Sequence, residues 1–365
     1  MSINTLPKIE ITFSPAWWSA KYEMDFGFPE CWQEPIRYTE RDQEQRRLLF
    51  ERFGDLGLGE RDPKPNPLVG VEFGHRFMSA FWNCEVIYLP DQWPHATPYP
   101  DAASRVFHLD VPEMKHSFAV ELAFRNAKIL EDRYGKVNSA VNFGGPLNNA
   151  VSVLGEEIFA LCASDVVLAQ NVLRKMGEAV RLIYDEVECV INKIPPERRK
   201  AKDWGIGNCP VGQISPQMYQ EVVLPVDIWF RNTFQEINSE ANFNLHHCGI
   251  FHPYVEVYQK LHPTDIDVGP GTDLQKTRQA FPDARISAYF EPATLATMSR
   301  AQIDAEVKKM ITDTLPVDRF TFIRAIEVGP ELSDQTIYDL LTSTDRLISE
   351  NFFEELGEYH QDKSN

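Results

Sequence analysis

A histidine and a cysteine two residues apart are the pair in this sequence best suited to chemistry. They are His246 and Cys248, and they close a short apolar stretch that starts near residue 242. On a β-strand, residues i and i+2 point to the same face, so an imidazole and a thiolate would stand side by side. Such a pair forms half of a typical zinc site. The alternative is a half-buried cysteine next to a hydrogen-bonded histidine.

A carboxylate at the end of a later apolar strand is the candidate third ligand. Glu327 closes that strand and would lie at the rim beside His246 and Cys248 if the strands form a closed barrel. Three protein ligands with an open fourth position describe a catalytic zinc site. Glu327 could instead pair with Arg324 or Arg76, or cap the loop that follows.

Several other polar residues lie at or near expected strand ends. Glu72, Asn142 and Asp267 are the predicted catalytic residues, although Asp267 could also support a metal ligand, bind substrate or cap its strand. His247 would point away from its two neighbours, to pack behind the strand or to support a ligand. Cys209 is a competing thiolate ligand in an Asn-Cys-Pro sequence that is typical of a loop.

The elements that must position these residues alternate between apolar strands and amphipathic helices. Strands of this kind, separated by helices of ten or more residues, indicate parallel β-α units. The expected strands are 68–73, 84–89, 140–143, 204–209, 242–248, 266–268, 285–290 and 320–327, and the main helices are 117–134, 147–163, 165–193, 216–238, 300–314 and 334–351. About eight strands predict an α/β fold of the (β/α)8 TIM-barrel type, whose active site lies at the carboxyl ends of the strands. A doubly wound open sheet is the alternative.

The chain is expected to consist of three parts. Residues 1–66 are an aromatic-rich N-terminal extension, residues 67–357 are the barrel, and residues 358–365 are a polar tail. The extension holds Trp17, Trp18, Phe26, Phe28 and Trp32, which are too many large apolar groups for a free segment. We expect them to be buried, either over the barrel mouth or in a homodimer interface.

Composition and charge exclude several classes of protein. Of the 365 residues, 43% are hydrophobic and 25% are charged, as in ordinary globular proteins. The net charge of −18 argues against binding to nucleic acid, whose phosphates it would repel. We also expect no membrane span, no signal peptide and no disulfide framework, because the six cysteines are scattered. A cytoplasmic protein fits these features.

Four stretches of the sequence resemble the uroporphyrinogen decarboxylase superfamily. They are Gly144–Leu147 with Leu154-Gly155, Ile214–Tyr219 with Val223–Pro225, His246–Gly249, and Asp265–Leu274 followed by Glu291–Leu295. They occur in the family's order and span about two-thirds of the chain. The resemblance implies a (β/α)8 barrel, which agrees with the number of expected strands.

The resemblance also implies an activity, a metal and a partner. The decarboxylases of the superfamily use no metal and carry an Arg-Gln-Ala-Gly-Arg stretch that this sequence lacks. The other branch consists of corrinoid-linked methyltransferases, which hold zinc with His-x-Cys and a distant ligand that is often cysteine. Here His246 and Cys248 match, but Glu327 stands at the distant position, which favours an oxygen donor such as an O-methyl compound over a thiol.

The implied function is a zinc-dependent methyltransferase that exchanges a methyl group between a small molecule and a corrinoid. The corrinoid would come from a separate corrinoid-binding protein, because this sequence has no Asp-x-His-x-x-Gly segment. The partners are therefore that protein and a small-molecule methyl donor or acceptor. A metal-free decarboxylase and a non-catalytic barrel are the alternatives.

Overall fold

The computed structural model describes residues 7–194, 203–235 and 242–356, and the polar tail expected at 358–365 lies outside these ranges. The chain folds as two compact units. One contains residues 1–21 together with residues 243–365, and the other contains residues 22–242. The boundary expected near residue 66 stays a prediction.

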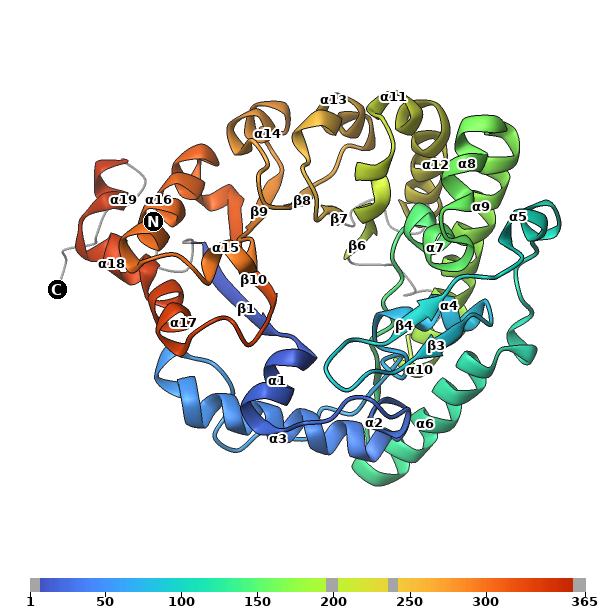
Figure 1. The fold of residues 1–365 in the computed structure, drawn as a ribbon, viewed down its shortest axis with the longest axis horizontal. Helices are drawn as coiled ribbons and strands as arrows, with labels where there is room; N and C mark the ends of the chain where they lie inside the picture. Colours follow the sequence, from blue (N-terminus) through green and yellow to red (C-terminus); the bar gives the residue numbers. More distant parts are fainter. Residues whose placement is uncertain (1–6, 195–202, 236–241, 357–365) are drawn as a thin grey trace. The chain divides into compact units, whose positions relative to one another are not determined.

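The unit formed by the two ends of the chain is built on a parallel sheet. Its strands are β1 (Lys8–Phe13), β10 (Phe320–Val328), β9 (Arg285–Tyr289), β8 (Asp265–Val268) and β7 (Asn242–His247), in that order. Figure 1 shows β1 lying beside β10, although the two strands come from opposite ends of the chain. The strands form because apolar and polar residues alternate: in β7, Phe243, Leu245 and His247 are buried while the residues between them are half-exposed.

Helices connect these strands, as parallel pairing requires. The connecting helices between β7 and β10 are α13 (Val255–Tyr258), α14 (Leu274–Ala280), α15 (Pro292–Leu295) and α16 (Arg300–Asp313). Three more follow β10: α17 (Asp334–Leu341), α18 (Ser343–Ser349) and α19 (Phe352–Glu355). Helix α16 begins with a capping box in which the side chain of Ser299 accepts from the first turn and that of Gln302 accepts from the backbone of Ser299. Its buried face contains Ile303, Val307 and Ile311.

The continuous unit, residues 22–242, is mainly helical. Its helices are α2 (Glu30–Gln33), α3 (Pro35–Phe53), α4 (Phe77–Phe81), α5 (Ala102–Arg105), α6 (Phe118–Tyr134), α7 (Pro146–Leu154), α8 (Glu157–Ser164), α9 (Val166–Ile183), α10 (Cys189–Ile191), α11 (Pro216–Met218) and α12 (Leu224–Gln235). Helix α1 (Pro15–Tyr22) precedes them. The strands are β2 (Leu68–Val69) and β5 (Asn138–Ser139), which pair in parallel, the hairpin β3 (Glu85–Ile87) and β4 (His95–Thr97), and β6 (Asp203–Gly207).

Several strands differ from expectation. In place of the strands expected at 68–73 and 140–143, the structure has the two-residue strands β2 and β5, which form a separate two-stranded sheet. The strand expected at 84–89 is not part of the parallel sheet, because β3 pairs antiparallel with β4 in a separate two-stranded hairpin. In contrast, β1 lies in a segment where no strand was expected. The long helices expected at 165–193 and 216–238 contain π-helical turns at Tyr184–Glu188 and Tyr219–Val223.

Most of the N-terminal aromatic side chains are buried. Trp17, Trp18, Phe26 and Trp32 are at most 6% exposed, whereas Phe28 is 56% exposed. The indole rings of Trp17 and Trp18 pack edge to face, with centroids 4.9 Å apart, as expected for aromatic pairs in a core.

The architecture is therefore α/β with a parallel sheet, as expected, and it is consistent with a β/α barrel. Among the described residues, no helix has the length and apolar character needed to cross a membrane.

Candidate metal centre

The carboxyl end of β7 presents His246 and Cys248 to the same side, as their spacing predicted. The His246 side chain is 29% exposed, and Cys248, just beyond the strand, is exposed. His247 lies between them and is fully buried. Its ring packs against Tyr254 and Phe251, and its Nδ1 lies 3.1 Å from the hydroxyl oxygen of Tyr258. The alternation of the strand therefore places His247 in the core and leaves His246 accessible.

Cys209 lies at the carboxyl end of β6, where a short 3-10 helix, Cys209–Gln213, begins. The preceding residue, Asn208, is fully buried and donates from Nδ2 to Asp227 Oδ2 at 2.9 Å. The hydroxyl of Tyr219 donates to the same oxygen at 2.7 Å. Burial raises the pKa of Asp227 to about 6, even though these two donors lower it. This buried triad fixes the backbone from which the thiol of Cys209 projects.

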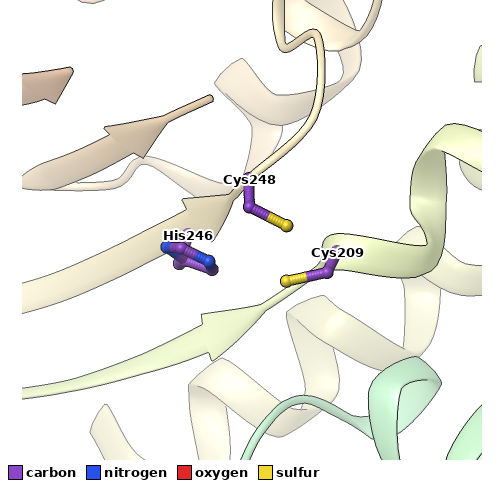
Figure 2. Close-up of side chains that lie close together, drawn as sticks. All are labelled: Cys209, His246 and Cys248. Atoms are coloured by element: carbon purple, nitrogen blue, oxygen red, sulfur yellow. The ribbon is translucent and has the colours of Figure 1, made fainter. Parts of the chain in front are cut away.

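Three potential ligand atoms come together in the structure. The sulfur atoms of Cys209 and Cys248 and a ring nitrogen of His246 all lie within 4.8 Å of one another, and Figure 2 shows the three side chains converging. In a tetrahedral zinc site, ligand atoms lie roughly 3.3–3.8 Å apart, given Zn–S and Zn–N bonds of about 2.3 and 2.0 Å. Small side-chain rotations would therefore complete the geometry. Two sulfurs and one imidazole form a donor set that suits zinc, and three protein ligands leave a fourth position open.

Glu327 is not a member of this group of three. It is the penultimate residue of β10, and its φ of +55° lies at an irregularity in the pairing with β1, where the register shifts between Ile11 and Phe13. Its backbone N–H donates to the hydroxyl of Thr12 on β1 at 2.9 Å, and its side chain is exposed. Its role as a metal ligand stays a prediction, and Cys209, the competing thiolate, is the residue found beside the His-x-Cys pair.

Asp267 lies next to His246 on the neighbouring strand β8. Its Oδ2 is 3.6 Å from Nδ1 of His246 and accepts from Asn244 Nδ2 at 3.2 Å, while Oδ1 accepts from Arg324 at 2.9 Å. Burial alone would raise the pKa of Asp267, but the imidazole of His246 and the guanidinium of Arg324 hold it below its usual value. Asp267 is thus an ionised carboxylate in contact with a candidate ligand.

The other two predicted catalytic residues lie in the unit of residues 22–242. Glu72, just beyond β2, is 1% exposed, and its carboxylate accepts from the backbone N–H of Gly70 at 2.7 Å and from Asn126 Nδ2 at 3.2 Å. Burial raises its pKa to about 7. Asn142, beyond β5, is exposed, and its Nδ2 lies 3.0 Å from Nδ1 of His75. Their catalytic roles stay predictions.

Sequence reasoning missed the residues that support the centre from behind. Asp227 and Tyr219 lie on the helical segment after Cys209. Their polar groups fall on an otherwise apolar face of that segment, and this pattern could have identified them. Arg324 was considered only as a partner for Glu327. Its actual partners, Asp267 and Glu10, are 57 and 314 residues away in sequence, so no local pattern indicates these pairs.

Two comparisons relate this chain to known proteins, one by sequence family and one by fold. The family model described as uroporphyrinogen decarboxylase (URO-D) matches residues 73–337. Among solved structures, a methyltransferase from Methanosarcina mazei has a similar fold, with a TM-score of 0.62, 14% sequence identity and 95% of each chain covered. No curated protein sequence matches this chain.

Proposed function

Because the chain belongs to the uroporphyrinogen decarboxylase family, we propose that it is a zinc-dependent methyltransferase of that family. It would move a methyl group between the heteroatom of a small molecule, an O-methyl compound or a thiol, and a corrinoid carried by a separate protein. With an O-methyl donor, such a protein would form the O-demethylase component of a two-protein system.

The observation that carries this proposal is the convergence of Cys209, His246 and Cys248. Zinc bound by these residues would act as a Lewis acid that polarises the substrate heteroatom or lowers the pKa of a thiol. The three side chains would leave the fourth position for that heteroatom. Since Cys248 is exposed and His246 is partly exposed, a ligand can reach this side of β7.

The remaining predicted site residues have subsidiary roles in the proposal. Glu327 would supply an oxygen ligand that joins the sulfur and nitrogen donors or exchanges with substrate. Asp267 would hold His246 by its Nδ1 edge. Asn142, which is exposed beyond β5, would contact the part of the substrate that does not react. Glu72 is buried beyond β2 and would hold the segment after that strand through Gly70 and Asn126.

The ligand group, and not the fold, favours this reading over decarboxylation, although one solved structure of similar fold is a methyltransferase. That protein shares the fold over nearly the whole of both chains, although at 14% identity the likeness concerns the fold alone. The decarboxylase alternative is supported by the description of the matching family. However, a decarboxylase of that type needs no metal, so a thiolate-rich ligand group would have no role in it.

Metal content is the first test. We expect about one zinc per chain in purified protein, because the three donors form a site with one open position. Replacement Cys248→Ala or Cys209→Ala should remove most of it. Cys162→Ala is the matched control, since Cys162 is buried in α8 and burial raises the pKa of its thiol to about 11. The proposal would be excluded if the purified protein holds no zinc and gains neither stability nor activity when zinc is added.

The third-ligand prediction has its own test. Glu327→Gln keeps the size of the side chain but weakens its oxygen donor. If Glu327 binds the metal, zinc affinity should fall at least about tenfold, the scale seen for changes in residues that support a metal site. Unchanged affinity in this variant, together with loss in Cys209→Ala, would assign the third position to Cys209 alone.

Methyl transfer is the decisive assay. The protein should change the absorption spectrum of methylcobalamin in the presence of thiols, or of cob(I)alamin in the presence of methoxy-aromatic donors. A corrinoid-binding protein should accelerate the reaction by positioning cobalt at the site. Methyl transfer that continues unchanged in His246→Ala would show that His246 and Cys248 are not the catalytic centre. Release of carbon dioxide from porphyrinogens without metal would favour the decarboxylase alternative.

A further inference from the structure

Five strands of the parallel sheet each contribute one polar side chain to a single layer next to the candidate metal ligand. The residues are Glu10 on β1, Arg324 on β10, Tyr289 on β9, Asp267 on β8 and His246 on β7. Strand register puts them on one face: Glu10 is paired with Arg324, Arg324 with Tyr289, and His246 with Asp267. Asp267 is itself paired with Ser287, two residues before Tyr289 on the same face of β9. Residues at paired positions of neighbouring strands point to the same face, so the side chains meet.

Arg324 is the centre of this layer. Its Nε donates to Glu10 Oε2 at 2.7 Å, and its Nη1 donates to Asp267 Oδ1 at 2.9 Å and to the hydroxyl of Tyr289 at 3.3 Å. The guanidinium also lies 4.6 Å from the ring centre of Phe322, and the side chain is only 19% exposed. A planar guanidinium held by two carboxylates and an aromatic face has little freedom to turn.

This arrangement restricts what Asp267 can do. With Oδ1 engaged by Arg324, the carboxylate presents Oδ2 to Nδ1 of His246, at 3.6 Å. That separation slightly exceeds a hydrogen bond, and a small rotation of the imidazole closes it. A carboxylate at Nδ1 favours the tautomer with its proton on that nitrogen, which leaves the lone pair of Nε2 for a metal.

We infer that Arg324 is a positioning residue: by anchoring Asp267, it selects the Nδ1-protonated tautomer of His246 and aims Nε2 at the metal. This inference rests on the proposed function for its metal, but the tautomer itself is a property of the metal-free protein. Arg324 is not one of the three candidate ligands, and in this inference it acts through Asp267.

The chain supplies a matched control for a purely structural role. Arg285 on β9 forms an ion pair with Asp265 on β8 at 2.7 Å, and these two residues are also paired in register. Asp265 lies two positions before Asp267 on the same strand. Removing Arg285 therefore breaks the same kind of cross-strand ion pair in the same sheet without changing the carboxylate beside His246.

The first readout is the tautomer of His246 in metal-free protein. Protein labelled with 15N at its nine histidines would be examined by long-range 1H–15N correlation, with His246 assigned by its loss in His246→Gln. Wild type and Arg285→Gln should show the Nδ1-protonated form, whereas Arg324→Gln should show a mixture of both tautomers. Arg324→Lys should be intermediate, because an ammonium group keeps the charge but cannot bridge both carboxylates.

The second readout is zinc affinity measured by competition with a chelator. Arg324→Gln should bind zinc about tenfold more weakly than wild type, and Arg285→Gln should match wild type within about twofold. A wild-type His246 protonated on Nε2 would overturn the inference even if every variant failed to fold. So would a tautomer and affinity unchanged in folded Arg324→Gln. Wild-type protein that binds no zinc refutes the proposed function instead, because the tautomer measurement does not depend on metal.

Discussion

The buried carboxyl group of Glu72 makes the stability of the protein depend on pH. Its side chain accepts two hydrogen bonds but is almost completely removed from water, and burial raises its pKa from the ordinary value of 4.5 to about 7. The native state therefore keeps this proton to a higher pH than the unfolded state does. Stability should fall as pH rises from about 4.5 to about 7 and should become level above that range.

The magnitude follows from the two pKa values. The difference between 4.5 and about 7 corresponds to about 3 kcal/mol of unfolding free energy, most of which should be lost between pH 5 and pH 8. Glu72→Gln removes the ionisation but keeps the shape of the side chain. The variant should be less stable than wild type at pH 5, and the difference should shrink or reverse by pH 8.

The assay is urea denaturation at pH 5, 6, 7 and 8, followed by tryptophan fluorescence. Five of the seven tryptophans lie in the unit of residues 22–242 that contains Glu72, so fluorescence mainly reports that unit. Glu121→Gln is the control, because Glu121 is an exposed residue on the same helix, α6, as Asn126. A free-energy difference between wild type and Glu72→Gln that stays constant from pH 5 to pH 8 would refute the reasoning.

Two further changes test how the fold is held together. Arg278 donates to five backbone carbonyl groups in buried or partly buried positions, so Arg278→Met should leave these unsatisfied and lower the unfolding free energy by about 3 kcal/mol in the same urea assay. Gly70 has a φ of +86°, and an added Cβ would lie 2.6 Å from Val141, so Gly70→Ala should cost at least about 2 kcal/mol. Gly57→Ala, with a similar φ but open space around it, should cost about 1 kcal/mol, and equal losses at both glycines would contradict the steric argument.

The elements that could be predicted from sequence are those whose signal is local. Strands β7 to β10 were expected close to their actual bounds, because each is a short apolar or alternating run between turn residues. The same alternation placed His246 and Cys248 on one side of β7 and His247 on the other. A side-chain period of two residues carries this information without any knowledge of the rest of the fold.

The features that could not be predicted depend on partners far away in sequence. The strand at residues 8–13 was missed although Ile9, Ile11 and Phe13 alternate with polar residues, but its pairing with β10 at the other end of the chain has no local signal. Similarly, the sequence does not show whether Cys209 or Glu327 lies beside His246 and Cys248, because this depends on where the segment after β6 lies in the folded chain. The ion pair of Arg324 with Asp267 depends on strand register, which no single segment encodes.

The pairing of β1 with β10 also imposes an order on synthesis of the protein. The hydroxyl of Ser14, just after β1, donates to the carbonyl oxygen of Val328, 314 residues later. At roughly 5–20 residues per second, β1 leaves the ribosome roughly 15–60 s before its partner strand exists. During that interval the contiguous unit of residues 22–242 can fold, whereas Trp17 and Trp18 have no completed core to enter. The nascent chain therefore carries an unpaired strand and two exposed indole rings until translation is nearly finished, and a chaperone that binds apolar segments would find its substrate there.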